Sequence, residues 1–199
     1  MEALGIAYVI FYVIIYGLLL LLGVACYIVN AMALSTIAKR RGMEKPWAAW
    51  IPVGDGWLMG KLSDDYRTKM NGEYSGRAQD ILKQGIAMMI GYAVMLVGAL
   101  LVVVFAAATA AFAGFMVLVI LGYILLIADM IFVIIMAVRY AIRYYKALFD
   151  LYRSCMPNMS VPFLLLSIFV NYAMPVCLMI CRNRDDGMPL VEYQDETLE

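Results

Sequence analysis

The chain has 199 residues, of which 65% are hydrophobic and only 15% are charged, and its mean hydropathy is +0.86. Soluble domains are about 45–50% apolar and about 25% charged, so this much apolar surface indicates a protein embedded in a lipid bilayer. Fifteen basic residues balance fifteen acidic ones, which argues against nucleic-acid binding. The composition also excludes a disordered chain, a collagen-like repeat and, with four cysteines, a disulfide scaffold.

The first predicted membrane span covers residues 4–30. No charged side chain occurs from Ala3 to Ala38, and a charge at the bilayer centre costs about 2.5–3.5 kcal/mol even on the mildest scale. At about 1.5 Å per residue, a helix of this length exceeds a hydrocarbon core of about 30 Å, which predicts one crossing with an overhang. A cleaved signal peptide is the alternative, but no basic residue precedes the apolar run and the run is too long.

A second apolar run is long enough for two crossings. It begins at Gln84 and continues to Val138, interrupted only by Asp129. We expect two spans, at residues 83–105 and 112–138, because a single helix of this length would extend far beyond the bilayer. The small residues of segment 106–114 offer a place for a tight turn without charges, and they allow two helices to pack closely.

The last apolar run extends from Ser154 to Cys181 and contains three prolines. We favour a fourth crossing, over residues 161–181. A re-entrant hairpin that turns between Asn171 and Pro175 is the alternative, because proline interrupts helices and irregular backbone is tolerated in a membrane where protein buries it. The sequence therefore predicts an all-α polytopic membrane bundle with four membrane segments, the last of them either crossing or re-entrant.

The distribution of basic residues predicts the orientation of the chain. Lys and Arg near the ends of spans remain in the cytoplasm, whereas acidic residues contribute little. Segment 39–83 carries nine basic residues, segment 106–114 carries none, and only one charged residue, Glu2, precedes the first span. We therefore expect the N-terminus outside and residues 39–82 and 139–160 in the cytoplasm. A complete fourth crossing would place the acidic tail at 182–199 outside, together with two arginines, against this rule.

The segment after the first span contains all three tryptophans of the chain, Trp47, Trp50 and Trp57. Indole rings favour the headgroup region, so this proline-bounded stretch is typical of an element that lies along the membrane surface. A basic run precedes it and would lie among anionic headgroups; it comprises Lys39, Arg40 and Arg41. Membrane anchoring of the loop at 39–82 is the simpler interpretation, and a specific site for a lipid or a protein partner is the alternative.

A charged face is predicted on a helix that continues the third span, over residues 139–153. Its members recur at intervals of three and four positions, which stacks them on one side: Arg139, Arg143, Lys146, Asp150 and Arg153. Aromatic and aliphatic residues occupy the other side, which predicts an amphipathic juxtamembrane helix. A face solvated among headgroups is the simpler interpretation, and a docking site for an anionic lipid or an acidic partner is the alternative. Residues 63–80 are polar and mixed in charge, and we expect them to form a solvated loop.

Asp129 is the only Asp, Glu, Lys or Arg between Lys83 and Arg139. Because it precedes Arg139 by ten positions, we place it about 15 Å deeper, close to the middle of the bilayer. One role for it is to bind or relay a cation or a proton. The other is structural: a protonated carboxyl that forms a hydrogen bond across a helix interface, with Asn171 or Asn30 as the partner.

No motif for catalysis, a cofactor or a metal stands out. The chain has no histidine, which is the commonest general base, and no glycine-rich phosphate loop or G-x-S-x-G turn. Cys177 and Cys181 share a helix face, but without a histidine or a neighbouring carboxylate they form no convincing metal set. We therefore expect no catalytic residue, no cofactor and no metal, and an enzyme is the least favoured class.

Two stretches of the sequence resemble one protein family. The residues after the first span include A-K-R-R-G at 38–42 and P-W-A-A-W-I-P-V-G-D at 46–55. This pattern resembles a motif of small, uncharacterised multi-pass membrane proteins of Gram-positive, often clostridial, bacteria. The stretch from Leu151 to Asn183 is similar to the end of the same proteins, although Cys181 stands where a phenylalanine is common. The resemblance implies a bacterial inner membrane and supplies no activity.

Two classes of function remain. The favoured one is a non-enzymatic scaffold, accessory protein or sensor of lipids or partners, which acts through its basic and Trp-rich cytoplasmic face. The alternative is a small oligomeric channel or transporter for ions or protons that uses Asp129. The expected partners are membrane lipids, together with a second copy of the chain or another membrane protein at the small-residue faces. Nucleic acid is not among them.

Overall fold

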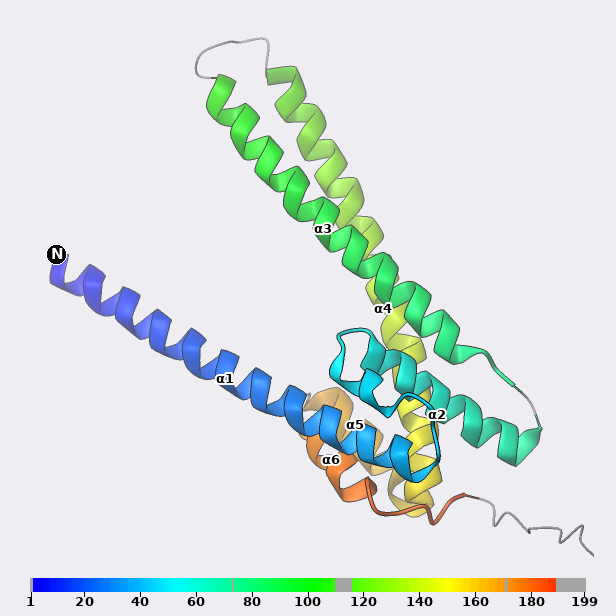
Figure 1. The fold of residues 1–199 in the computed structure, drawn as a ribbon. Helices are drawn as coiled ribbons and strands as arrows, with labels where there is room; N and C mark the ends of the chain where they lie inside the picture. Colours follow the sequence, from blue (N-terminus) through cyan, green and yellow to red (C-terminus); the bar gives the residue numbers. More distant parts are fainter. Residues whose placement is uncertain (1, 73, 110–115, 171, 189–199) are drawn as a thin grey trace, which may run out of the picture.

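A computed structural model of the chain describes residues 2–72, 74–109, 116–170 and 172–188 (Figure 1). Within these ranges the chain forms six α-helices and two short 3₁₀-helices and contains no β-strand, which confirms the predicted all-α class. The α-helices are α1 (Glu2–Arg40), α2 (Gly54–Asn71), α3 (Arg77–Thr109), α4 (Met116–Cys155), α5 (Ser160–Phe169) and α6 (Ala173–Cys181). The 3₁₀-helices are η1 (Pro46–Trp50) and η3 (Pro157–Met159).

Three of the helices, α1, α3 and α4, are long and apolar enough to cross a membrane. Their apolar side chains are largely exposed: Leu20 is 68% exposed, Leu96 69% and Val117 71%. Apolar surface of this extent is unfavourable in water, so the three helices indicate a membrane protein. The spans predicted at residues 4–30, 83–105 and 112–138 fall on these helices, except that residues 112–115 lie outside the described ranges.

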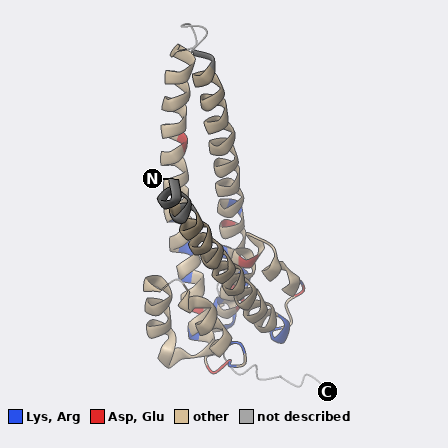
Figure 2. Cartoon of the chain, turned by 90° about the vertical axis from the view of Figure 1, so that its left-hand side faces the viewer, with Lys and Arg blue, Asp and Glu red and all other residues tan. Residues whose placement is uncertain are grey.

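Helices α3 and α4 lie side by side and form a long hairpin (Figures 1 and 2). Glycines allow the close approach, because a Cβ on Gly91 or Gly122 would lie 2.8 or 2.6 Å from a valine methyl group of the opposite helix. The turn predicted at 106–114 begins later than expected, since residues 106–109 are still helical. Alanine is the strongest helix former, which explains this extension. The remainder of that segment lies outside the described residues.

The buried core lies at one end of the molecule, which we call the packed end. Here the second half of α1 meets η1, α2, the start of α3, the end of α4, α5 and α6 (Figure 1). Its largest fully buried side chains are aliphatic, aromatic or thiol groups: Leu34, Ile37, Leu58, Met59, Leu62, Ile81, Leu148, Leu151, Tyr152, Cys155, Cys177 and Leu178. Most of the charged residues also gather at this end (Figure 2).

The solvated loop predicted at residues 63–80 is wrong. Helix α2 takes up the first part of this segment and α3 the last part, and Ser63 and Asp64 are buried. The apolar side of α2 is buried in the core and consists of Leu58, Met59, Leu62 and Tyr66. Polar residues dominate the rest of α2, so its apolar stripe is narrow. The sequence alone does not show that a charged residue of α2, such as Arg67, forms an ion pair with another helix.

The fourth crossing predicted at residues 161–181 is also wrong, because the chain folds back instead. Helices α5 and α6 have 10 and 9 residues, so each is about 15 Å long or less, half of a hydrocarbon core. Helix α5 ends at Phe169, and the carbonyl of the next residue, Val170, accepts a hydrogen bond from the Ala173 N–H at 2.8 Å. Pro175 lies in the first turn of α6, where its missing N–H costs nothing. This reversal corresponds to the alternative hairpin.

The residues after α6, at 182–188, return to the end of α4, and we call them the strap. The Asp186 N–H donates to the Cys155 carbonyl at 3.2 Å, and the Gly187 N–H donates to the Ser154 carbonyl at 3.1 Å. A Cβ on Gly187 would lie 2.1 Å from the Arg153 carbonyl oxygen, so only glycine fits this approach. The segment from 155 to 186 therefore starts and ends at the same place in the packed end.

Candidate anion-binding site

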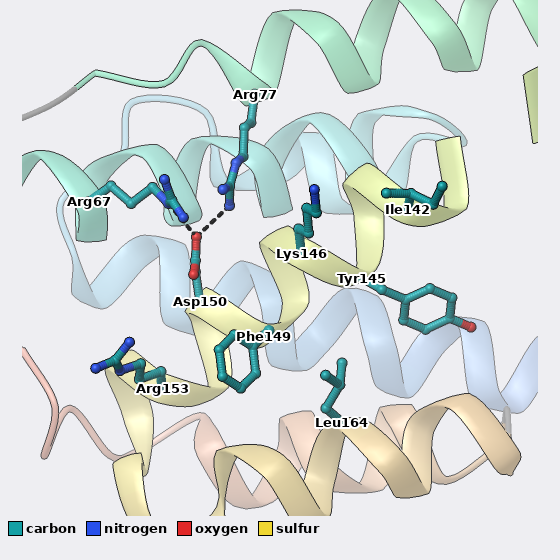
Figure 3. Close-up of a pocket in the computed structure, with 9 residues that line it drawn as sticks. All are labelled: Arg67, Arg77, Ile142, Tyr145, Lys146, Phe149, Asp150, Arg153 and Leu164. Carbon is teal, nitrogen blue, oxygen red and sulfur yellow. Dashed lines mark hydrogen bonds and ion pairs between the residues drawn. The ribbon is translucent and has the colours of Figure 1, made fainter. Parts of the chain in front are cut away.

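A pocket of about 420 Å³ opens in the packed end, between α2, the start of α3, α4 and α5 (Figure 3). It combines cationic side chains, one carboxylate and an apolar wall. The residues that line it are Arg67, Arg77, Ile142, Tyr145, Lys146, Phe149, Asp150, Arg153 and Leu164.

Asp150 holds the cationic wall in place. Its side chain is 10% exposed, and its Oδ2 accepts hydrogen bonds from Ser63 Oγ at 2.9 Å, from Arg67 Nε at 2.8 Å and from Arg77 Nη1. Figure 3 shows both arginines converging on this one oxygen. Since Arg67 comes from α2 and Arg77 from α3, the carboxylate ties both helices to α4.

Asp64 fixes the position of Arg77 through the backbone. Its carboxylate accepts hydrogen bonds from the Arg77 and Ala78 N–H groups, both at 3.1 Å, and from Ser75 Oγ at 2.5 Å. These are free N–H groups of the first turn of α3, so Asp64 caps that helix from α2. Gly60 permits the approach, because a Cβ there would lie 2.6 Å from Ala78 Cα.

The pocket has an excess of positive charge. It contains four cationic side chains and one carboxylate. Lys146 and Arg153 form no ion pair with any residue in the described ranges, and both lie on the Asp150 face of α4. Side chains such as Phe149 and Leu164 form the apolar part of the wall (Figure 3). A cationic wall beside an apolar one matches a ligand with an anionic group and a hydrophobic part.

The predicted charged face on α4 is divided by the structure. Lys146, Asp150 and Arg153 meet in the pocket, whereas Arg139 is exposed and Arg143 approaches Asp80, with 3.5 Å between Nη1 and Oδ2. The other two pocket arginines come from the segment that was predicted as a loop. Their one signal in the sequence is that each borders an apolar pattern of helical spacing, since Arg67 follows that of α2 and Arg77 precedes that of α3.

The three tryptophans do not form one surface. Trp47 and Trp50 on η1 are 57% and 46% exposed, while Ala48 and Ala49 between them are buried. The Tyr27 hydroxyl donates to the Trp50 carbonyl at 2.8 Å and so joins α1 to η1. Trp57 lies in α2 instead and packs against the core, with Lys61 Nζ 5.0 Å from the centre of its ring.

The basic run at the end of α1 is only partly exposed. Lys39 is exposed, but the Arg41 side chain is 3% exposed, with its Nη2 2.8 Å from Asp185 Oδ1 and 2.8 Å from Ser154 Oγ. Arg40 Nη2 lies 2.6 Å from the other oxygen of Asp185. The expectation that all three residues lie among headgroups is therefore wrong for Arg41. Its partner lies in the strap, more than a hundred residues away in sequence.

Asp129 lies apart from all of these groups, in the α3–α4 hairpin. Its Oδ2 is buried and has no hydrogen-bond partner among the described residues. The bond expected to Asn30 is not formed among the described residues, where Asn30 Oδ1 also lacks a partner. Asn171, the other expected partner, lies outside the described residues.

No family model, curated protein or solved structure was found to match this chain. The chemistry of the pocket is therefore argued from its own residues.

Proposed function

We propose that the protein is a non-enzymatic integral membrane protein that binds a phosphate group in the pocket of the packed end. The observation that carries the proposal is the set of four cationic side chains around a single carboxylate. Arginine presents several N–H donors that match the oxygens of a phosphate, and lysine adds a compact charge. Because Asp150 uses only Nε of Arg67 and Nη1 of Arg77, further N–H groups of both arginines remain as donors.

We infer that the phosphate belongs to an anionic lipid. Basic pockets between membrane helices on the cytoplasmic side are suited to phosphate headgroups. The apolar wall of the pocket would then contact the hydrophobic part of the same lipid. The protein would act as an accessory or sensory membrane protein that responds to anionic lipid, and this role agrees with the favoured interpretation of the sequence.

We further propose a multi-pass arrangement in a bacterial inner membrane, with the N-terminus outside and the packed end in the cytoplasm. The reversal between α5 and α6 supports this orientation, because it keeps Arg182 and Arg184 at the same end as Lys39, in agreement with the positive-inside rule. Trp47 and Trp50 would anchor η1 in the headgroup layer, and the exposed cations of α4 would form an amphipathic juxtamembrane surface.

Lipid binding by the purified full-length chain tests the proposal. The chain is delipidated in detergent, titrated with phosphatidylglycerol or phosphatidylcholine, and analysed by native mass spectrometry. We expect preferential binding of phosphatidylglycerol, weakened about thirtyfold by the double substitution Lys146→Gln and Arg153→Gln, since each basic group near the surface contributes about 1 kcal/mol. Arg139→Gln is the matched control, because Arg139 is an exposed cation of the same helix that does not line the pocket.

Two further outcomes separate the sources of phosphate. Competition by inorganic phosphate at concentrations close to those of the lipid would identify a soluble phosphate compound as the ligand. Equal losses in the double variant and in Arg139→Gln would show diffuse attraction to headgroups and would contradict a defined pocket.

A further inference from the structure

The α3–α4 hairpin contains a second pocket, remote from the anion-binding site. Its volume is about 280 Å³, and every residue that lines it is apolar except Asp129. Asp129 is the last lining residue along α4 and therefore lies at the end of the pocket nearer the packed end. Glycines line it from both helices, Gly98 on α3 and Gly122 on α4.

Asp129 lines this pocket and carries an unsatisfied acceptor. Its Oδ2 is buried and has no hydrogen-bond partner in the described part of the chain. A buried polar atom without a partner is unfavourable, and a buried carboxylate is more so. A ligand that donates a hydrogen bond from a positively charged nitrogen would remove both penalties.

The walls of the pocket determine how a ligand enters. Leu101, Leu121 and Leu125 line it and are 50%, 51% and 61% exposed on the apolar outside of the hairpin. In a bilayer these side chains face lipid, so the route to Asp129 passes through the hydrocarbon region. The ligand must therefore dissolve in the membrane and carry its charge on a mainly apolar body.

We propose that this pocket binds a lipophilic amine whose protonated nitrogen donates to the Asp129 carboxylate. A second copy of this chain is a poor source of that cation, because the sequence contains no Lys or Arg between Lys83 and Arg139 or between residues 3 and 38. The pocket shares no lining residue with the anion-binding site. The proposal therefore does not depend on the proposed function.

Binding of 4-phenylbutylamine to the full-length chain tests this proposal. The protein is placed in nanodiscs of phosphatidylcholine, and binding is measured by equilibrium dialysis, with empty nanodiscs subtracted. We expect saturable binding of one amine per chain. The uncharged analogue 4-phenylbutanol should bind with an affinity lower by about tenfold or more, because it lacks the charge that Asp129 recognises.

Three variants locate the site. Asp129→Asn keeps the shape of the side chain and removes its charge, and should weaken amine binding about tenfold. Leu101→Trp fills the pocket and should abolish binding. Leu100→Trp is its matched control, because Leu100 is 64% exposed on the same helix and does not line the pocket; binding should be unchanged.

Two results would overturn the proposal. One is equal uptake of the amine by the original chain and by Asp129→Asn. The other is an equal loss in Leu100→Trp and Leu101→Trp, with circular dichroism showing that both variants keep their helices.

Discussion

Helix α4 carries two carboxylates in opposite surroundings. Asp150 lies in the packed end, where one of its oxygens accepts hydrogen bonds from a serine and two arginines of other helices. Asp129 lies in the hairpin, where its buried oxygen has no partner in the described chain. At the packed end many elements meet, and the carboxylates of Asp64 and Asp150 accept hydrogen bonds from other helices. In the hairpin only two helices meet, so a polar group there depends on a partner from outside the chain.

The two halves of α1 show the same difference between buried and exposed surroundings. Its second half is buried against α6, η1 and α2, with Leu34 and Ile37 fully covered. Its first half extends alone, and Tyr16 and Leu20 are 67% and 68% exposed (Figure 1). The packed end therefore resembles the core of a soluble domain, whereas the projecting helices need a bilayer as their surroundings.

The largest expected effect is all-or-none and concerns the side of the membrane on which the strap lies. Single cysteines at Glu2, Lys39 and Asn183 are treated with a membrane-impermeant maleimide in intact and in permeabilised cells. Because Arg40 and Arg41 both pair with Asp185, positions 39 and 183 should react on the same side, and position 2 on the opposite side. Reaction of 39 and 183 on opposite sides would restore the fourth crossing.

A large loss of stability is expected when Asp150 is removed. Asp150→Ala leaves two arginines without their shared partner, and breaking such a partly buried pair should lower the free energy of unfolding by about 3 kcal/mol. Asp129→Asn should not lower it, because no hydrogen bond to Oδ2 is lost and the substitution removes a buried charge. Denaturant unfolding in detergent micelles measures both. Similar losses in the two variants would remove the distinction between the packed end and the hairpin.

The neighbouring residues Asp64 and Asp65 offer a finer comparison within the packed end. Asp64→Ala removes the cap of α3 and should cost about 1–2 kcal/mol of stability. Asp65→Ala breaks only a surface pair with Lys69, four residues along α2 and 2.9 Å away, and should cost about 0.5 kcal/mol or less. Thermal unfolding of the two variants under identical conditions checks the order. If Asp65→Ala proves the more harmful, the assigned cap is wrong.

The sequence predicts the projecting helices well because their signal is local. Long charge-free runs are enough to find α1, α3 and α4, and the interval between charges places Asp129 deep in the apolar part of α4. The helical continuation of the third span past Arg139 also follows from local spacing, and the structure has it up to Cys155. Each of these inferences uses residues that are close together in the sequence.

The packed end could not be predicted in the same way, because long-range pairs determine it. The sequence places Arg67 and Arg77 in a loop, since nothing in their own segment shows that Asp150 neutralises them. The sequence places Arg41 among the headgroups for the same reason, although it pairs with Asp185 in the strap. The sequence favours a crossing for the last segment, because its apolarity does not show that the chain folds back into two short helices.

The smallest expected effect concerns Asp55, near the start of α2. Burial raises the pKa of its carboxyl above the ordinary value of 3.8, although backbone hydrogen bonds, including one from the Gly56 N–H at 2.7 Å, act in the opposite direction. Above the raised folded-state pKa, the buried carboxylate destabilises the fold. Below the ordinary pKa, the group is neutral in both the folded and the unfolded chain, and the penalty disappears.

Asp55→Asn should therefore raise the melting temperature of the detergent-solubilised chain at pH 7. The gain should shrink as the pH falls through the folded-state pKa towards 3.8, where the original chain also carries a neutral group. Asp65→Asn is the matched control, because Asp65 is part of an exposed ion pair of the same helix; its substitution should give no gain at pH 7. A gain in Asp55→Asn that grows on acidification would show that the carboxylate stabilises the packed end, as Asp64 and Asp150 do through their hydrogen bonds.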